Sequence, residues 1–259
     1  MPFIPVGDLN VHYRLTGPAD APVIVFINAL GTDFRIWDDV VAAIGNRARI
    51  LTYDKRGHGL TTASPGDYSG TLLADDLIGL LDALSIERAS LVGQSVGGLI
   101  AQVAATHAPQ RVTKLVLSNT AAVFGTPQTW TDRAATVRAS GTAPLVDATM
   151  ERWFSPAFHA TNPADVAGAA TMLARTDRIG YAGTCAALRD ADLRDNATRI
   201  TRPTLVIGGQ HDGSTPPAVV AALAAAVPGA RLEMLETAHL PCIERPAEHA
   251  ALIAGHLLG

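Results

Sequence analysis

Short apolar segments recur along the chain, separated by glycine, proline and polar residues. They cover residues 23–27, 50–53, 90–92, 115–117, 205–207 and 232–235. Continuous apolar runs of this length are typical of parallel strands that are buried on both faces of a sheet. Segments with a helical period lie between them, at residues 72–84, 99–107, 218–227 and 247–258. This alternation predicts an α/β fold with a doubly wound, mostly parallel sheet.

The beginning and the middle of the chain depart from this pattern. Residues 3–6 and 11–14 alternate between apolar and polar positions, which predicts an N-terminal antiparallel hairpin at the sheet edge. Residues 121–199 lack strand-like runs and contain short helical patterns broken by glycine and proline. We therefore expect a helical cap at 121–199, inserted into a core formed by residues 1–120 and 200–259. Such a cap would lie over the carboxyl ends of the strands, where open α/β sheets bind ligands.

Composition and charge narrow the class of ligand. Of the 259 residues, 48% are hydrophobic and 17% charged, as expected for one globular domain with a large core. The formal net charge of −4 comes from interspersed residues without a basic run, which argues against nucleic acid or an anionic membrane as a partner. A small molecule is the expected ligand, and the oligomeric state is left open.

The cysteines and the N-terminal segment indicate neither a metal site nor secretion. Cys185 and Cys242 are far apart and lack metal-binding spacing, so we expect buried, unreactive thiols and no metal. The first residues have no charged segment followed by a long apolar one, and the most apolar helical run, residues 218–227, is too short to span a bilayer. These features favour a cytoplasmic protein.

A candidate nucleophile lies in the segment GQSVGG at residues 93–98. This segment directly follows the predicted strand at 90–92 and precedes a helical pattern. A serine on such a sharp turn needs a strained backbone, and glycines two residues to either side remove Cβ atoms that would collide. We therefore predict Ser95 as a nucleophile, with the Val96 N–H at the helix start directed towards an oxyanion. The alternative is a purely structural turn.

A nucleophilic serine needs a base, and the base needs an acid that orients it. His239 follows the predicted strand at 232–235 through a short loop, so it should lie at the carboxyl end of that strand, within reach of Ser95. His58 lies at the same end, but we interpret residues 54–59 as a structural turn. Asp212 follows the strand at 205–207, which gives the chain order Ser, Asp, His. A structural loop histidine and a turn-capping aspartate are the alternatives.

The second oxyanion donor is expected in the loop after the first buried strand, at residues 28–31. The Leu30 N–H is the candidate, on position alone. A plain connecting loop is the alternative.

With these residues in place, the chain resembles the α/β-hydrolase superfamily over its full length, and within it the 3-oxoadipate enol-lactonases of aromatic catabolism. The likeness extends beyond the three candidate catalytic residues to residues 28–33, 53–59, 91–98, 151–156, 180–183 and 187–190. The chain departs from these lactonases at Ala29, where they usually carry serine. That difference leaves a backbone donor at Leu30 possible.

The resemblance implies hydrolysis of 3-oxoadipate enol-lactone to 3-oxoadipate in the protocatechuate (β-ketoadipate) pathway, without a cofactor. Ser95 would attack the ring carbonyl, and an enolate would leave. Other readings remain open. The same fold also serves small-ester and C–C bond hydrolases, and a triad-bearing small-molecule receptor would differ from an enzyme by very slow turnover.

The carboxymethyl group of such a lactone needs a cationic partner under the cap. Arg133 and Arg138 are the candidates in the first cap helix. We favour Arg133, because it lies three residues from Trp130 and could share a wall of the site with Trp153. A solvated surface arginine is the alternative.

Overall fold

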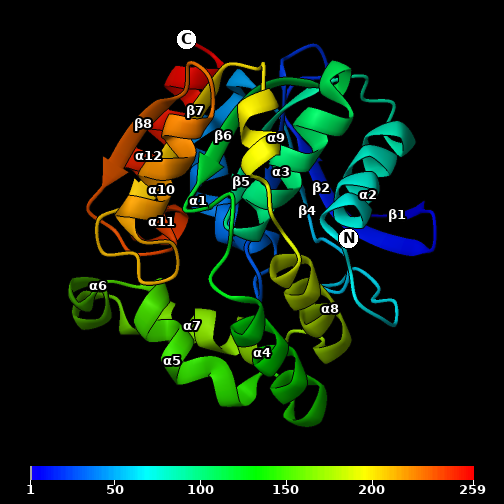
Figure 1. Ribbon diagram of the computed structural model, residues 1–259. Coiled ribbons are helices and arrows are strands. Elements are labelled where there is room, and N and C mark those ends of the chain that lie inside the picture. Colours follow the sequence, from blue (N-terminus) through cyan, green and yellow to red (C-terminus); the bar gives the residue numbers. More distant parts are fainter. Residues whose placement is uncertain (1) are drawn as a thin grey trace.

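A mixed sheet forms the centre of the molecule (Figure 1). The computed structural model describes residues 2–259, within which eight strands pair in the order β1-β2-β4-β3-β5-β6-β7-β8. The strands are β1 (Phe3–Val6), β2 (Leu9–Thr16), β3 (Val23–Ile27), β4 (Arg49–Tyr53), β5 (Ala89–Gln94), β6 (Val112–Ser118), β7 (Thr204–Gly209) and β8 (Arg231–Leu235). Strand β2 pairs antiparallel with β1 and β4, and the other pairs are parallel. The predicted sheet and N-terminal hairpin are thus confirmed.

The central strands are apolar throughout because helices cover both faces of the sheet. In β3, for example, Ile24 and Val25 point to opposite faces, and both are fully buried. On one face, α1 (Asp38–Ile44) packs against α12 (Pro246–Leu257), with α11 (Pro241–Glu244) beside them. On the other lie α2 (Gly70–Ala83), α3 (Val96–His107), α9 (Arg194–Arg199) and α10 (Pro217–Ala226) (Figure 1). Short 3-10 helices occupy Phe34–Trp37, Gly45–Arg47, Pro109–Arg111 and Ala143–Leu145.

The strand order reverses beside β3, and this reversal positions the site. The chain passes from β3 to β4 on one side and then crosses to β5 on the other side. The loops that leave the carboxyl ends of β3 and β5 therefore diverge, and open α/β sheets bind ligands at such a point. Residues 28–33 and Ser95 form these two loop starts.

Most of the helices between β6 and β7 form a layer beyond the carboxyl ends of the strands (Figure 1). They are α4 (Pro127–Ser140), α5 (Val146–Trp153), α6 (Pro156–Thr161), α7 (Pro163–Ala174) and α8 (Arg178–Arg189). The expected cap range of 121–199 also includes α9, which packs against α3 and α10 of the core. We propose that the cap consists of α4–α8 and that the chain has returned to the core at α9.

Helix α8 contacts the core at a point where only glycine fits. A Cβ atom on Gly57 would lie 2.3 Å from the Cα atom of Gly180. Since Gly57 also has a φ of 66°, a larger residue there would be strained as well as crowded. This contact fixes the first turn of α8 against the loop after β4.

Both cysteines are free and buried, and burial raises the pKa of the Cys185 thiol to about 12. Both side chains therefore match the expectation of unreactive thiols. Within residues 2–259, no helix combines the length and the apolar character that crossing a membrane requires.

Candidate active site

Ser95 lies on the sharp turn between β5 and α3, with φ 56° and ψ −117°. A non-glycine residue with this conformation is strained by about 1–3 kcal/mol and persists only where its surroundings fix it. Here the Ser95 N–H donates to Ser118 O at 2.9 Å, and its carbonyl accepts from Gly98 N at 2.8 Å and Thr120 Oγ1 at 2.7 Å. The turn therefore holds the serine backbone from both sides.

The glycines around Ser95 are required by close backbone packing. A Cβ atom on Gly93 would lie 2.3 Å from the carbonyl oxygen of Gly97, and one on Gly97 would lie 2.2 Å from the carbonyl oxygen of Ile27. No side-chain rotation can relieve contacts with backbone oxygens. The Gly-x-Ser-x-Gly spacing thus allows α3 to begin directly against β3.

His239 lies on the loop after β8 and is held by cap and core together. Its N–H donates to Trp153 O at 3.1 Å, and its carbonyl accepts from Gln94 Nε2 at 2.5 Å. Its Nδ1 atom lies 2.8 Å from Oδ2 of Asp212. Because a carboxylate only accepts hydrogen bonds, Nδ1 carries the proton and Nε2 is left as the basic nitrogen.

The Asp212 carboxylate is buried and accepts several further hydrogen bonds. Oδ1 accepts from the N–H groups of Ser214 at 2.7 Å and Thr215 at 3.0 Å. Oδ2 accepts from Thr215 Oγ1 at 2.6 Å and Asn119 Nδ2 at 2.9 Å. Burial opposes ionisation, but the charge of His239 and the hydrogen bonds from His239, Thr215 and Asn119 outweigh it and lower the pKa of Asp212 to about 2. The group is a carboxylate at neutral pH.

Asn119 is a member of this group that sequence reasoning did not single out. It directly follows β6, has a φ of 45°, and donates to both Asp212 and the carbonyl of Ala238. Its position at the end of the neighbouring strand is the signal that could have identified it.

A cavity of about 310 Å³ lies between the core and the cap. The core contributes Ser95, His239 and Leu30 to its wall. The cap contributes aromatic and cationic side chains, which include Trp130, Arg133, Arg152, Trp153 and Tyr181. The structure thus brings six of the eight predicted site residues to one cavity. The other two, Asp212 and Val96, are buried next to His239 and Ser95.

Two arginines face this cavity without a carboxylate partner. The Arg133 guanidinium lies 5.0 Å from the centre of the Trp130 ring, and Arg152 Nη2 lies 3.3 Å from Thr149 Oγ1. Neither forms an ion pair with any group of residues 2–259, whereas Arg138 pairs with Asp67. Burial lowers the pKa of Arg152, and the charge of Arg133 lowers it further. The cavity therefore holds two cations that an anionic ligand could neutralise.

Arg152 was not identified from the sequence. It lies beside Trp153 in α5, a helix whose contacts with the core cannot be read from periodicity. The alternative cation considered from the sequence, Arg138, does not line the cavity.

The loop after β3 presents the Leu30 N–H at the cavity. Residues 29–32 form a turn in which Thr32 N donates to Ala29 O at 3.3 Å, and Gly31 has a φ of 77°. The N–H of the second residue in such a turn takes no part in the turn's own hydrogen bond. Neither the Leu30 N–H nor the Val96 N–H has a hydrogen-bond partner within the described part of the chain, residues 2–259. Both are thus available to a ligand.

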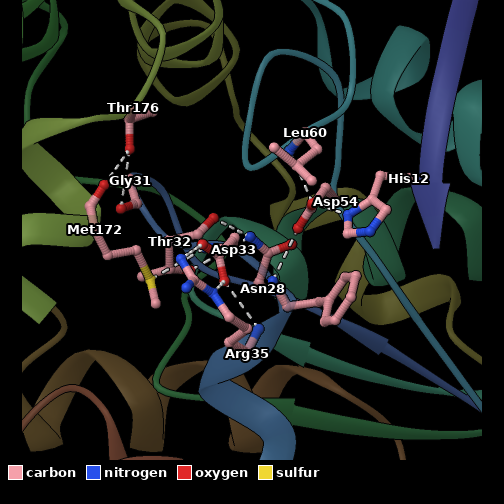
Figure 2. Close-up of polar contacts among 11 residues, drawn as sticks. His12, Asn28, Gly31, Thr32, Asp33, Arg35, Asp54, Leu60, Met172 and Thr176 are labelled. Carbon is pink, nitrogen blue, oxygen red and sulfur yellow. Dashed lines mark hydrogen bonds and ion pairs between the residues drawn. The ribbon is translucent and has the colours of Figure 1, made fainter. Parts of the chain in front are cut away.

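The same loop is tied to the cap and to the core (Figure 2). On the cap side, Thr176 Oγ1 donates to Gly31 O at 3.2 Å, and the Asp33 N–H donates to the sulfur of Met172 at 3.3 Å (Figure 2). On the core side, Lys55 Nζ donates to Ala29 O at 2.6 Å. Since the C=O and N–H of a trans peptide point in opposite directions, this bond directs the Leu30 N–H away from Lys55.

His58 does not line the cavity, and its Nδ1 lies 3.1 Å from the carbonyl oxygen of Arg56 in its own loop. Asp54 in that loop accepts from His12 Nδ1 at 2.8 Å and from the Leu60 N–H at 2.9 Å (Figure 2). This geometry agrees with the interpretation of residues 54–59 as a structural turn.

Among residues 2–259, no three His, Cys, Asp or Glu side chains are grouped so that they could hold a metal ion.

Comparison with known proteins defines the class. Residues 22–246 match the family model described as the alpha/beta hydrolase fold, and the chain belongs to this family. It is 37% identical over 239 residues to 3-oxoadipate enol-lactonase 2 of Acinetobacter baylyi, which is 92% of this chain and 90% of that protein. It is also 33% identical over 228 residues to a putative carbamate hydrolase, RutD, of Pseudomonas savastanoi, 84% of this chain and 86% of the relative.

Among solved structures, the enol-lactonase from Burkholderia xenovorans LB400 matches with a TM-score of 0.97 and 38% identity, covering 100% of both chains. The family and these relatives identify the chain as an enzyme that hydrolyses carboxylic esters, the class that includes lactonases.

Proposed function

We propose that this enzyme opens the ring of 3-oxoadipate enol-lactone to give 3-oxoadipate, in the catabolism of aromatic compounds. One observation carries the proposal: a serine on a strained turn and a histidine share a cavity with two arginines that form no ion pair with any carboxylate of residues 2–259. A substrate that combines an ester with a carboxylate suits both features. The similarity to enol-lactonases supports the same substrate.

In the proposed reaction, Ser95 is the nucleophile and His239 the general base. His239 Nε2 takes the hydroxyl proton while Ser95 Oγ attacks the ring carbonyl. Asp212, 2.8 Å from the other ring nitrogen, holds the tautomer and stabilises the imidazolium that forms. The negative charge on the carbonyl oxygen is stabilised by the Leu30 and Val96 N–H groups.

The tetrahedral intermediate then collapses, and the ring C–O bond breaks. The enolate oxygen leaves, the acyl group stays on Ser95, and the proton held by His239 passes to the enolate. An enolate leaves more easily than an alkoxide, and conversion of the enol to the ketone drives the step forward. A water molecule activated by His239 then releases the second carboxylate of the product.

We propose that Arg133 binds the carboxymethyl group of the lactone. Its guanidinium is positioned by the Trp130 ring, and it has no carboxylate partner among residues 2–259. Trp130 and Trp153 would form the apolar walls against which the lactone ring lies. Burial of the substrate carboxylate under the cap would then be offset by a charge-assisted hydrogen bond.

A panel of substrates tests the proposal on the wild-type enzyme. The panel contains 3-oxoadipate enol-lactone, α-angelica lactone, which carries methyl in place of the carboxymethyl group, a simple aryl acetate and a carbamate. The proposal requires the highest kcat/KM for the carboxylated lactone. Comparable values for all the esters would indicate a general esterase, a preference for the carbamate would indicate a carbamate hydrolase, and binding without turnover would indicate a receptor.

A further inference from the structure

The cavity holds one more cation than the carboxylate of the proposed substrate requires. Arg133 and Arg152 both line it, and the charge of Arg133 acts on the pKa of Arg152. Two guanidinium groups that share one small cavity, without an ion-pair partner among residues 2–259, repel each other. A single carboxylate balances one of them, so the second needs a different role.

The two arginines belong to different walls of the cavity. Arg133, in α4, lies over the Trp130 ring, and Tyr181 of α8 lines the same cavity. Its wall is therefore formed by the cap helices α4 and α8, which pack against each other.

Arg152 lies instead on the side of the acid and the base. Its side chain packs on Gly213, where an added Cβ atom would lie 3.5 Å from the Arg152 Cγ atom. Gly213 precedes the two residues whose N–H groups hold the Asp212 carboxylate. The next residue after Arg152, Trp153, accepts the backbone N–H of His239 at 3.1 Å. The backbone that holds the catalytic base is thus continuous with Arg152.

The reaction places a negative charge on the same side. The carbonyl oxygen is stabilised by the backbone N–H groups of Leu30 and Val96, which form an oxyanion hole. The leaving enolate oxygen lies outside this hole. It must be close to His239, because the same imidazole that took the Ser95 proton returns it to the leaving group. A cation that enters the same cavity as His239 from the Gly213 side is therefore suited to the leaving oxygen.

We propose that Arg152 is a further catalytic residue, which donates a hydrogen bond to the departing enolate oxygen while Arg133 binds the carboxylate. This assignment rests on the proposed function, because it assumes an enol leaving group. When the ring C–O bond breaks, its electron pair stays on the ring oxygen. The guanidinium stabilises that oxygen until the proton from His239 reaches it. Arg152 itself neither gains nor loses a proton and forms no covalent bond.

A pair of matched variants, Arg152→Met and Arg133→Met, tests the assignment on two lactones. α-Angelica lactone has the enol leaving group of 3-oxoadipate enol-lactone but no carboxylate. Arg152→Met should lower kcat by about 10- to 100-fold on both lactones, as expected for a lost hydrogen bond to a charged group. Arg133→Met should lower kcat/KM on the carboxylated lactone only. A loss for Arg152→Met confined to the carboxylated lactone would overturn the assignment and make Arg152 a second carboxylate ligand.

Aryl acetates with leaving groups of different pKa provide a readout that a structural role would not move. If Arg152 stabilises the leaving oxygen, Arg152→Met should be most impaired on the esters with the poorest leaving groups, so the slope of log kcat/KM against leaving-group pKa becomes steeper. A uniform loss across the series would contradict the assignment. Arg152→Gln, a second uncharged variant, is measured in the same way should Arg152→Met fail to fold.

Failure of the proposed function gives a different result. If the wild-type enzyme shows no preference for the carboxylated lactone, the substrate assignment fails, and the aryl acetate series still tests Arg152.

Discussion

Replacing Asp212 by asparagine should disable the base without removing any atom from the site. Every contact to this carboxylate is donated: by Ser214 N, Thr215 N, Thr215 Oγ1, Asn119 Nδ2 and His239 Nδ1. An amide brings two N–H bonds into a place that offers only donors. The backbone N–H groups cannot turn away, so the amide oxygen must face them and the NH₂ group must face His239.

The imidazole can accept from that NH₂ group only by moving its own proton to Nε2. In this tautomer the nitrogen that faces the serine is a donor, and no base remains. The wrong tautomer lowers turnover about 10⁴-fold in serine proteases. Because an enolate leaving group asks less of the histidine as an acid, we expect a loss of about 10²- to 10³-fold in Asp212→Asn, with KM within about threefold of wild type.

The assay is steady-state hydrolysis of the enol-lactone and of an aryl acetate, with Asp192→Asn as the matched control. Asp192 is exposed and, within residues 2–259, forms an ion pair with Arg194 alone, so its replacement should leave kcat unchanged. The aryl acetate should show a loss at least as large as the lactone. Turnover of Asp212→Asn within threefold of wild type would show that Asp212 does not orient His239 and would assign that role to another group.

Three further outcomes follow from the geometry. Lys55→Met should lower kcat about tenfold with little change in KM. Removal of a complete oxyanion donor costs about 10²- to 10³-fold, and the loss should be smaller here because Lys55 only orients the Leu30 peptide. An unchanged kcat would exclude that role of Lys55. Gly97→Ala should lower the free energy of unfolding by about 3 kcal/mol in urea titrations, since its Cβ atom would lie 2.2 Å from a backbone oxygen; wild-type stability would contradict the packing. The pKa of Asp212 is lowered from 3.8 to about 2, so its carboxylate stabilises the fold above about pH 4, and about 2 kcal/mol of this is lost as the pH falls towards 2. The unfolding free energy of Asp212→Asn should lack this part of the pH dependence. Identical pH profiles of unfolding for wild type and Asp212→Asn would contradict a lowered pKa of Asp212.

The regular core could be predicted because burial on both faces leaves a strong pattern. The apolar run at residues 23–27 coincides with β3, and Pro217 and Pro246 begin α10 and α12. Other strands are longer than predicted: β6 runs from Val112 to Ser118, because Lys114 can extend its amine to the carbonyls at the end of α12 while its stem lies on the sheet. Apolar runs alone therefore underestimate the strand ends.

The triad candidates could be located because each follows a strand at the same edge of the sheet. The remaining contacts depend on how distant segments pack. Asn119 reaches Asp212 across 93 positions of sequence, and Lys55 reaches Ala29 from the loop after the neighbouring strand β4. Arg152 faces the cavity because α5 packs against the loop of His239, a contact without a sequence period. Such residues become visible only once the topology is known.

Whether Ser95 is the nucleophile of a lactonase is tested by the turnover of 3-oxoadipate enol-lactone by wild type and by Ser95→Ala, followed as loss of the lactone's ultraviolet absorbance. Ser95→Ala removes one oxygen from a turn whose backbone bonds are independent of the side chain, so the variant should fold like wild type. This role of Ser95 requires a wild-type kcat on the order of 1–10³ s⁻¹ and a loss of more than about 10⁴-fold in the variant. A wild-type rate no greater than the uncatalysed reaction, or a folded Ser95→Ala variant within tenfold of wild type, would contradict it.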